Sequence, residues 1–516
     1  MKWNEKINRE AIKRFLSSFR VVFTIVVLLL VISCKDDLAG NQGNDTSAMT
    51  KQSNSLKTKF PVRQPKGAGS FYPADPQKLY SLVDSLLAKG KPLNLPGAMA
   101  VLVPHAGYVY SGEVAAASMC ELVKDFERVF VLAANHSSEA NFSGVSLPPV
   151  SSYAIPGAEI PLSPLVEELR KQSLFTSVPQ AHGAYMIEVE LPFLYTISGR
   201  GKKPSFSIIP MIVGRLDQQR AKQLASTLNK YADENTVFVF SVDLSHFYHD
   251  SKARKLDYAT IDAILSRNME ALAQATADGN QVLMTMVELA ELNGWDATLL
   301  KYKNSGDVTG DRDRVVGYAG IAFHKPVRFS PEQQKILLGL ARKTIEEHLE
   351  KGSASEPAQE VIGSHSILRV PRGVFVTLKK DGELRGCIGD LISNEPLYKG
   401  ISGFAVKAAT QDPRFKPVTR DELDGLDLSI SVLEYPHRMK VDDPRQYVKL
   451  LKPGRDGVIL VYKGRSSTYL PQVWEDLPDP VDFLSRLCMK QQAPANCWLE
   501  PDTVLFKYSA HEFGEE

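Results

Sequence analysis

The stretches that decide the fold of this chain are AMAVLVPH at residues 98–105, RVFVLAANH at residues 128–136 and TVFVFSVDLSH at residues 236–246. Each is a continuous run of β-branched and aliphatic residues rather than an alternation of apolar and polar ones. Continuous apolar runs are typical of strands buried on both faces, as in a parallel sheet covered by helices. The sequence therefore predicts an α/β domain with a mostly parallel sheet flanked by helices.

Each of these three runs ends in a histidine. They are His105, His136 and His246, and Asp243 lies in the third run. Ligands of open α/β sheets bind outside the carboxyl ends of the strands, so we expect these four side chains to meet in one pocket. Two or three imidazoles and a carboxylate form the ligand set of a non-haem iron or similar divalent-metal site with open positions. A single histidine after a strand is more often a hydrogen-bonded loop residue, but three at equivalent positions favour a pocket.

Small or turn-forming residues stand beside two of the histidines. Ala106 and Gly107 separate His105 from Tyr108, and Asn135 precedes His136. Such residues leave room for a ligand. We expect Tyr108 and Asn135 to line the pocket.

Six motifs in the first part of the chain resemble the Memo family. In chain order they are GSFYP (69–73), PHAGYVYSG (104–112), NHS (135–137), ELPFL (190–194), SVDLSH (241–246) and NSGDVTGDRDRVVGYA (304–319). The resemblance covers residues 61–325 and implies a fold like that of the class III extradiol dioxygenases, with a non-haem metal pocket. It also implies ligand roles for His105 and His136, with a third ligand from Asp243 or His246. Iron is the first expectation for the metal, and copper and zinc are alternatives.

The chain departs from the family pattern at two positions. Family members carry a Glu-His pair before the ELPFL motif, whereas this chain has Ala184 and Tyr185. His182 and Tyr185 remain as candidate catalytic groups, although a phenol with an ordinary pKa near 10 is a poor base at neutral pH. Ser245 stands where some relatives have a cysteine ligand, and we expect it to line the pocket. The missing pair puts ring-cleaving chemistry in doubt.

Residues 326–516 form a second module. Its motifs are LRGCIG (384–389), AATQDPRF (408–415) and STYLPQVWE (467–475), and they resemble the AMMECR domain, which implies an α+β fold and no particular mechanism. Cys387 lies beside Arg385 and between glycines, so it is a candidate nucleophile or redox thiol. The alternative, which we favour, is a small buried residue in a tight packing site.

The sequence of the amino terminus predicts the cellular compartment of the protein. Basic residues precede an apolar stretch that ends in VISC, so residues 1–33 resemble a bacterial lipoprotein signal peptide, with Cys34 as the lipidated residue. The apolar stretch falls short of the roughly 20 residues that a membrane span requires. Residues 34–60 are polar and predict a flexible tether, and its first residues, KDD, resemble a surface-export tag. We therefore expect a lipid-anchored cell-envelope protein on the surface of the outer membrane.

The balance of charged residues narrows the range of possible functions, and the cysteines are few. The chain has 61 Lys and Arg against 60 Asp and Glu, so it lacks the basic footprint of a nucleic-acid-binding protein. Cys488 and Cys497 are the nearest pair of the remaining cysteines, and their disulfide state is left open.

Residues 253–277 and 281–293 predict two amphipathic helices.

Two classes of function remain open. One is a membrane-tethered, metal-dependent oxidoreductase that acts on a small-molecule substrate. The other is a non-catalytic binding or scaffold protein that keeps a remnant pocket. Memo-like and AMMECR-like proteins also resemble two parts of the AmmeMemoRadiSam set, which implies a radical SAM protein as partner by analogy. An exported chain would not meet a cytoplasmic partner directly.

Overall fold

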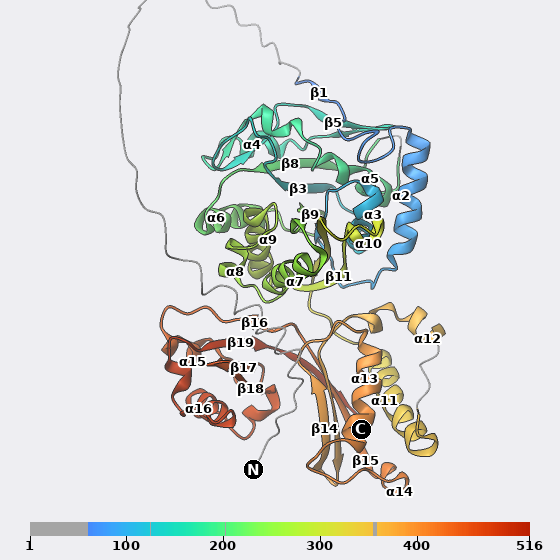
Figure 1. Cartoon of the computed structure of the whole chain (residues 1–516), viewed down its shortest axis with the longest axis vertical. Coiled ribbons are helices and arrows are strands. Elements are labelled where there is room, and N and C mark those ends of the chain that lie inside the picture. Colours follow the sequence, from blue (N-terminus) through green and yellow to red (C-terminus); the bar gives the residue numbers. More distant parts are fainter. Residues whose placement is uncertain (1–59, 124, 202, 354–358, 516) are drawn as a thin grey trace, which may run out of the picture.

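The computed structural model describes residues 60–123, 125–201, 203–353 and 359–515. The predicted signal peptide, Cys34 and all but the last residue of the predicted tether lie outside these residues. Within them, the chain forms an upper α/β domain and a lower domain built on two further sheets (Figure 1). No helix in this part of the chain is long and apolar enough to cross a membrane.

In the described residues, the first domain is built on a sheet of nine strands. Its strand order is β10-β12-β2-β9-β3-β8-β4-β7, and β11 pairs with β12. The strands are β2 (Ala100–Val103), β3 (Arg128–Ala134), β4 (Val145–Ser146), β7 (Phe175–Thr176), β8 (Ser207–Val213), β9 (Thr236–Ser241), β10 (His246–Tyr248), β11 (Asp296–Asn304) and β12 (Val315–His324). A small sheet beside it contains β1 (Val62–Arg63), β5 (Ser152–Ile155) and β6 (Ala158–Pro161).

The centre of the large sheet is parallel. Strands β2, β9, β3 and β8 run parallel in that order, and β12 and β4 add antiparallel strands on either side. The residues of β2 and β9 are buried throughout, because helices cover both faces of the sheet. The α/β class predicted from the continuous apolar runs is therefore confirmed.

Two helical layers complete the domain. Helices α2 (Pro76–Gly90), α3 (Tyr108–Met119) and α5 (Leu191–Ile197) share one apolar core with the sheet, and α6 (Gln218–Asn229), α7 (Asp250–Leu265) and α9 (Asn280–Asn293) share the other. The shorter elements are α4 (Leu165–Leu169), η1 (Pro179–Gly183), η2 (Glu188–Glu190), α8 (Met269–Ala273) and α10 (Gly306–Thr309).

The helix predicted over residues 253–277 is wrong in its extent. Helix α7 ends at Leu265, and α8 is a separate short helix. Arg267 adopts a left-handed conformation with φ of 57°, which breaks the first helix. Asn268 then caps α8, because its side chain accepts a hydrogen bond from the amide of Ala271. Residues 274–279 form a loop between α8 and α9.

The second domain is α+β, as predicted. It contains the antiparallel sheets β14-β13-β15-β20 and β16-β19-β17-β18. The strands are β13 (Val374–Lys380), β14 (Glu383–Asp390), β15 (Leu426–Leu433), β16 (His437–Arg438), β17 (Gly457–Tyr462), β18 (Arg465–Tyr469), β19 (Val504–Tyr508) and β20 (Ala510–Gly514). The helices are α11 (Pro331–Lys351), α12 (Gln359–Ser364), η3 (Ser366–Arg369), α13 (Leu397–Thr410), α14 (Arg420–Leu423), η4 (Pro444–Gln446), α15 (Tyr447–Leu450), η5 (Pro471–Trp474), α16 (Pro480–Lys490) and η6 (Cys497–Leu499).

Candidate metal centre

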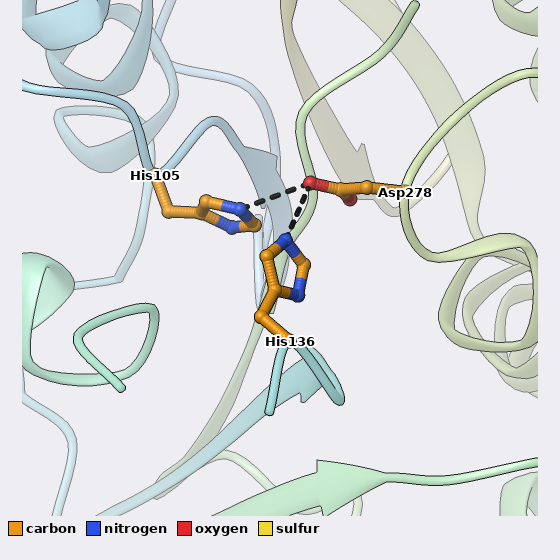
Figure 2. A group of neighbouring side chains, drawn as sticks. All are labelled: His105, His136 and Asp278. Carbon is orange, nitrogen blue, oxygen red and sulfur yellow. Dashed lines mark hydrogen bonds and ion pairs between the residues drawn. The ribbon is translucent and has the colours of Figure 1, made fainter. Parts of the chain in front are cut away.

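Two predicted histidines and one unpredicted aspartate meet at the carboxyl ends of the central strands. His105 and His136 each lie two residues beyond the end of their strand, β2 and β3. The Nε2 atom of His105 lies 3.0 Å from Oδ2 of Asp278, and Nε2 of His136 lies 3.1 Å from the same oxygen (Figure 2). One carboxylate oxygen therefore faces two imidazole nitrogens.

Asp278 enters the site from the loop between α8 and α9. The amide of Asp278 donates to the carbonyl of Asp243 over 3.1 Å, and the amide of Asp243 donates to Oδ1 of Asp278 over 3.2 Å. This pair of hydrogen bonds fixes the loop against the end of β9. The Asp278-Gly279 dipeptide is a turn signal that could have placed a loop here, but the prediction extended a helix to residue 277.

The hydrogen bonds of His136 determine what its ring presents to Asp278. Its Nδ1 lies 3.2 Å from the carbonyl oxygen of Ala134, and a carbonyl only accepts, so Nδ1 carries a proton and donates. A neutral ring would then direct the lone pair of Nε2 at a carboxylate oxygen 3.1 Å away. Two such lone pairs repel each other unless a cation, either a proton or a metal ion, lies between them. The geometry is that of a cation site.

A buried chain of polar atoms lies behind His105. Nδ1 of His105 is 3.1 Å from Oγ of Ser241, which is 2.9 Å from both Oε1 of Glu190 and the carbonyl oxygen of Met186. The other carboxyl oxygen of Glu190 is buried and has no hydrogen-bond partner within the described residues. Burial raises the pKa of Glu190 to about 8, so this carboxyl group is largely neutral at neutral pH. Glu190 is the first residue of the ELPFL motif, but its position behind His105 was not predicted from the sequence.

The carboxylates control the charge of the site. Burial alone would lower the pKa of His105, but the carboxylates of Asp243 and Asp278 outweigh it and raise that pKa to about 10. Burial also opposes ionisation of Asp278, yet the two histidines hold its pKa below the usual range. Burial and the charge of Asp278 raise the pKa of Asp243, although His105 acts in the opposite direction. The carboxylates of Asp243 and Asp278 thus stabilise positive charge at His105, where a bound cation would also be stabilised.

Asp243 and His246 form a second group of ligating side chains rather than completing the first. One group contains His105, His136 and Asp278, and the other contains Asp243, His246 and Asp278. Within each group, the donor atoms lie within 4.8 Å of one another. The predicted ligands Asp243 and His246 thus lie around the same carboxylate, that of Asp278, as the predicted ligands His105 and His136.

The two candidate catalytic groups lie in different surroundings. The ring of Tyr185 stacks on Phe71 and lies 6.3 Å from the ring of His105. Burial and the nearby aspartates raise the pKa of Tyr185, so its phenol stays protonated and can donate a hydrogen bond but cannot act as a base at neutral pH. His182 is buried, and its ring nitrogens lie 3.0 Å from Oγ of Ser146 and 3.3 Å from the hydroxyl of Tyr153.

The pKa of His182 is too low for this side chain to accept a proton at neutral pH. Burial and the charge of Arg63 lower it to about 3. The backbone carbonyl of His182 also accepts a hydrogen bond from Arg63 over 2.9 Å. The structure thus places His182 in a structural network, and only Tyr185 of these two lies beside the metal-ligand group.

Each of the three predicted pocket residues makes hydrogen bonds within the protein. The hydroxyl of Tyr108 donates to the carbonyl of Val189, and the side chain of Asn135 accepts from the amide of Ser137. Ser245 is buried, and its amide donates to Oδ1 of Asp257 over 2.8 Å. Their role toward a ligand stays a prediction.

Cys387 lies on β14 in the second domain. Its Sγ accepts a hydrogen bond from Thr377 over 3.3 Å, and its amide donates to Oδ2 of Asp412 over 2.9 Å. Burial raises the pKa of the thiol, which outweighs the opposite effect of Thr377 and Arg414. These surroundings favour the structural interpretation over a reactive thiolate.

The donor set of the first group fits a divalent transition metal. Two imidazoles and one carboxylate are the ligands of non-haem iron sites that keep open positions. Donor atoms bound to one ion at about 2.0–2.2 Å lie roughly 3 Å apart. The two nitrogen-to-oxygen distances of 3.0 and 3.1 Å match this spacing.

The fold and the site together define an α/β protein with a candidate two-histidine, one-carboxylate metal centre. Residues 63–322 match the family model described as Memo-like protein, and residues 338–513 match the model described as AMMECR1. The chain belongs to the Memo-like family and carries an AMMECR1 domain after its Memo-like domain.

Two relatives illustrate the similarity of each part of the chain. A MEMO1 family protein of Aquifex aeolicus is 34% identical over 283 residues, which cover 51% of this chain and 99% of that protein. A protein of Methanothermobacter thermautotrophicus is 38% identical over 188 residues, which cover 36% of this chain and 96% of that protein. The crystal structure of an uncharacterized protein from Pyrococcus horikoshii has 36% sequence identity and a TM-score of 0.34, covering 36% of this chain and 94% of that one.

Proposed function

We propose that this protein is an exported, membrane-tethered oxidoreductase whose Memo-like domain binds a divalent metal, iron first, at His105, His136 and Asp278. The single observation that carries the proposal is the approach of two Nε2 atoms to one oxygen of Asp278, at 3.0 and 3.1 Å. When bound, a ferrous ion held by two histidines and a carboxylate would supply redox chemistry toward dioxygen and a small-molecule substrate.

The residues around the ligands limit the reaction. Tyr185 can donate a hydrogen bond to a bound substrate, because its raised pKa keeps the phenol protonated at neutral pH. Deprotonation of a catechol requires a positioned base, and His182 is engaged by Ser146 and Tyr153. We therefore expect weak or no ring cleavage of catechol-type substrates, and a substrate that needs no such base.

The same observation supports the second candidate function. A protein that binds metal and ligand without turnover would need the ligand group and the pocket but no base. The AMMECR1 domain and a partner protein, such as a radical SAM protein suggested by analogy, would then supply the rest of the function. Turnover by the metal-loaded protein separates the two candidates.

Metal analysis tests the proposal. The chain is purified without a chelating tag, and metal per chain is measured for the unmodified protein, His105→Ala, His136→Ala and, as control, His182→Asn. We expect at least one metal ion per chain in the unmodified protein and the control, and about one ion fewer in the other two, with the fold retained because ligands at strand ends contribute little to the core. Metal content in the double variant His105→Ala, His136→Ala equal to that of the unmodified protein would contradict the site. Oxygen uptake by the iron-loaded protein supports the oxidoreductase, and metal without uptake across a substrate panel supports the binding protein.

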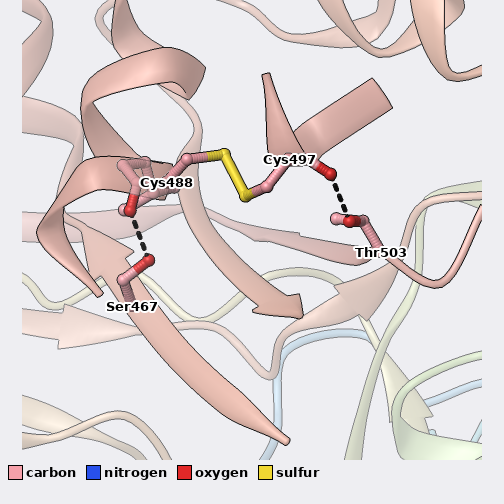
Figure 3. Close-up of a disulfide and its surroundings, with 5 residues drawn as sticks. Ser467, Cys488, Cys497 and Thr503 are labelled. Atoms are coloured by element: carbon pink, nitrogen blue, oxygen red, sulfur yellow. Dashed lines mark hydrogen bonds between the residues drawn. A yellow bond between two sulfur atoms is a disulfide. The ribbon is translucent and has the colours of Figure 1, made fainter. Parts of the chain in front are cut away.

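The proposed compartment rests on the pattern that ends at Cys34 and on a disulfide. Cys488 at the end of α16 is bonded to Cys497 in η6, with a Cα–Cα distance of 6.0 Å (Figure 3). Stable disulfides are typical of oxidising compartments, which supports export. Replacing Cys34 with alanine is expected to abolish acylation and move the protein out of the membrane fraction. Acyl chains on the Cys34→Ala protein would contradict the assignment.

A further inference from the structure

The two groups of ligating side chains in the pocket meet at one residue. Asp278 belongs both to the group with His105 and His136 and to the group with Asp243 and His246. A carboxylate has two oxygen atoms and can bind one cation with each, as in sites where two metal ions lie about 3.5–4 Å apart. The donor atoms of each group are therefore close enough together for each group to hold its own ion.

The second group is organised by its own elements. His246 is the first residue of β10, where it pairs with Val316 of β12. Its Nδ1 lies 2.9 Å from the carbonyl oxygen of Leu244, so Nδ1 donates and Nε2 is the nitrogen left to bind a metal. Oδ1 of Asp243 accepts from the amide of His105 over 2.8 Å, which fixes that carboxylate at the end of β9. Both donors are therefore held in place without an ion.

The charge of the pocket also favours a second cation. The carboxylates of Asp243 and Asp278 are both largely buried, and the amide of Asp243 donates to Oδ1 of Asp278. Oδ2 of Asp278 faces the two histidines of the first group, and the carboxylate of Asp243 lies outside that contact. Neighbouring buried carboxylates are stabilised by positive charge. A cation at the second group would add positive charge beside Asp243.

We propose that this pocket binds two divalent cations that share Asp278, the first held by His105 and His136 and the second by Asp243 and His246. The first ion is the one of the proposed function, on which this inference rests, and the second ion is additional. The mixed nitrogen and oxygen donors of the second group suit iron, manganese or zinc.

Manganese binding by the full chain tests the second ion. Chelator-treated protein is dialysed against Mn²⁺, and bound metal is measured together with its electron paramagnetic resonance spectrum. We expect about two ions per chain with an exchange-coupled signal, since ions that share a carboxylate lie close together. His246→Gln and Asp243→Asn are expected to bind about one ion without coupling, and Asp278→Asn to lose most of both. His249→Asn is the matched control, because His249 is exposed and asparagine keeps the helix cap.

The outcomes separate the second ion from the proposed function. One uncoupled ion in the unmodified protein, lost from His105→Ala and kept by His246→Gln, would overturn the second ion and leave the first. Coupled ions that persist in both His246→Gln and Asp243→Asn would overturn the assigned ligands. No bound ion in the unmodified protein would contradict the inference and the proposed function together. His246→Gln and Asp243→Asn change different segments of the chain, so if one variant misfolds the other still tests the second ion.

Discussion

At the scale of single residues, Ser241 decides how His105 is presented to a metal. Its Oγ lies 3.1 Å from Nδ1 of His105 and passes the hydrogen bond on to Glu190 or Met186, so Nε2 is left facing the pocket. Partners of this kind orient the ligand ring, and their loss typically weakens metal binding 10–100-fold.

We therefore predict that Ser241→Ala lowers the affinity for the metal by about 10–100-fold while the fold is retained. The measurement is a competition titration against a chromophoric chelator. An affinity equal to that of the unmodified protein would show that Ser241 does not position His105.

Cys387 is predicted to be structural and slow to react. Burial raises the pKa of its thiol, and Thr377 donates a hydrogen bond to the sulfur. We expect alkylation of the native protein at pH 7 to be at least about tenfold slower at Cys387 than in the urea-unfolded chain, because the thiolate is the reactive form. Site-resolved mass spectrometry measures both rates. Equal rates would favour a reactive thiolate.

At the scale of elements, the sequence predicted the parts of the site that follow apolar strands. His105 and His136 were predicted because β2 and β3 are continuous apolar runs, so the end of each strand can be recognised in the sequence. Asp278 was not found, because it lies in a short loop between two helices and no apolar run precedes it. Its position depends on contacts with Asp243, which is 35 residues away, and no local pattern records such a contact.

Gly279 lets the loop with Asp278 approach the sheet. A Cβ atom at this position would lie 2.9 Å from Cγ2 of Val242 and 3.4 Å from Cβ of Ala134, so the loop would have to move. We predict that Gly279→Ala displaces Asp278 and weakens metal binding at least about tenfold. Gly339→Ala is the control, because a Cβ there meets nothing within 4 Å. Equal metal affinity in Gly279→Ala and the control would contradict this role.

At the scale of the whole molecule, a buried polar network joins the two domains. Arg372 of the second domain donates to Oδ2 of Asp296 over 2.6 Å and to Oγ1 of Thr298 over 3.0 Å. His324 at the end of β12 lies 2.8 Å from Oγ1 of Thr298, and its Nδ1 lies 2.7 Å from the carbonyl oxygen of Lys325. Because Nδ1 must donate to that carbonyl, Nε2 accepts from Thr298, and the ring is neutral. No pattern in the sequence predicted this contact between the modules.

The neutral state of His324 makes stability depend on pH. Burial lowers its pKa to about 4, whereas an unfolded histidine titrates near 6.5, so the unfolded chain binds more protons between these values. This histidine's contribution to stability is therefore lost as the pH falls from about 6.5 to about 4, by about 3 kcal/mol. His324→Asn should be less stable at pH 7 and lose less stability on acidification, which urea unfolding at pH 7 and 4.5 measures. An equal loss in both proteins would contradict the assignment.

The central claim is that His105, His136 and Asp278 hold one metal ion. Anomalous diffraction from crystals of the metal-loaded protein, recorded on both sides of the absorption edge of the metal, tests it most directly. The account predicts a peak at bonding distance, about 2.0–2.2 Å, from the Nε2 atoms of both histidines and from a carboxylate oxygen of Asp278. No metal peak at bonding distance from these three residues in fully loaded protein would contradict it.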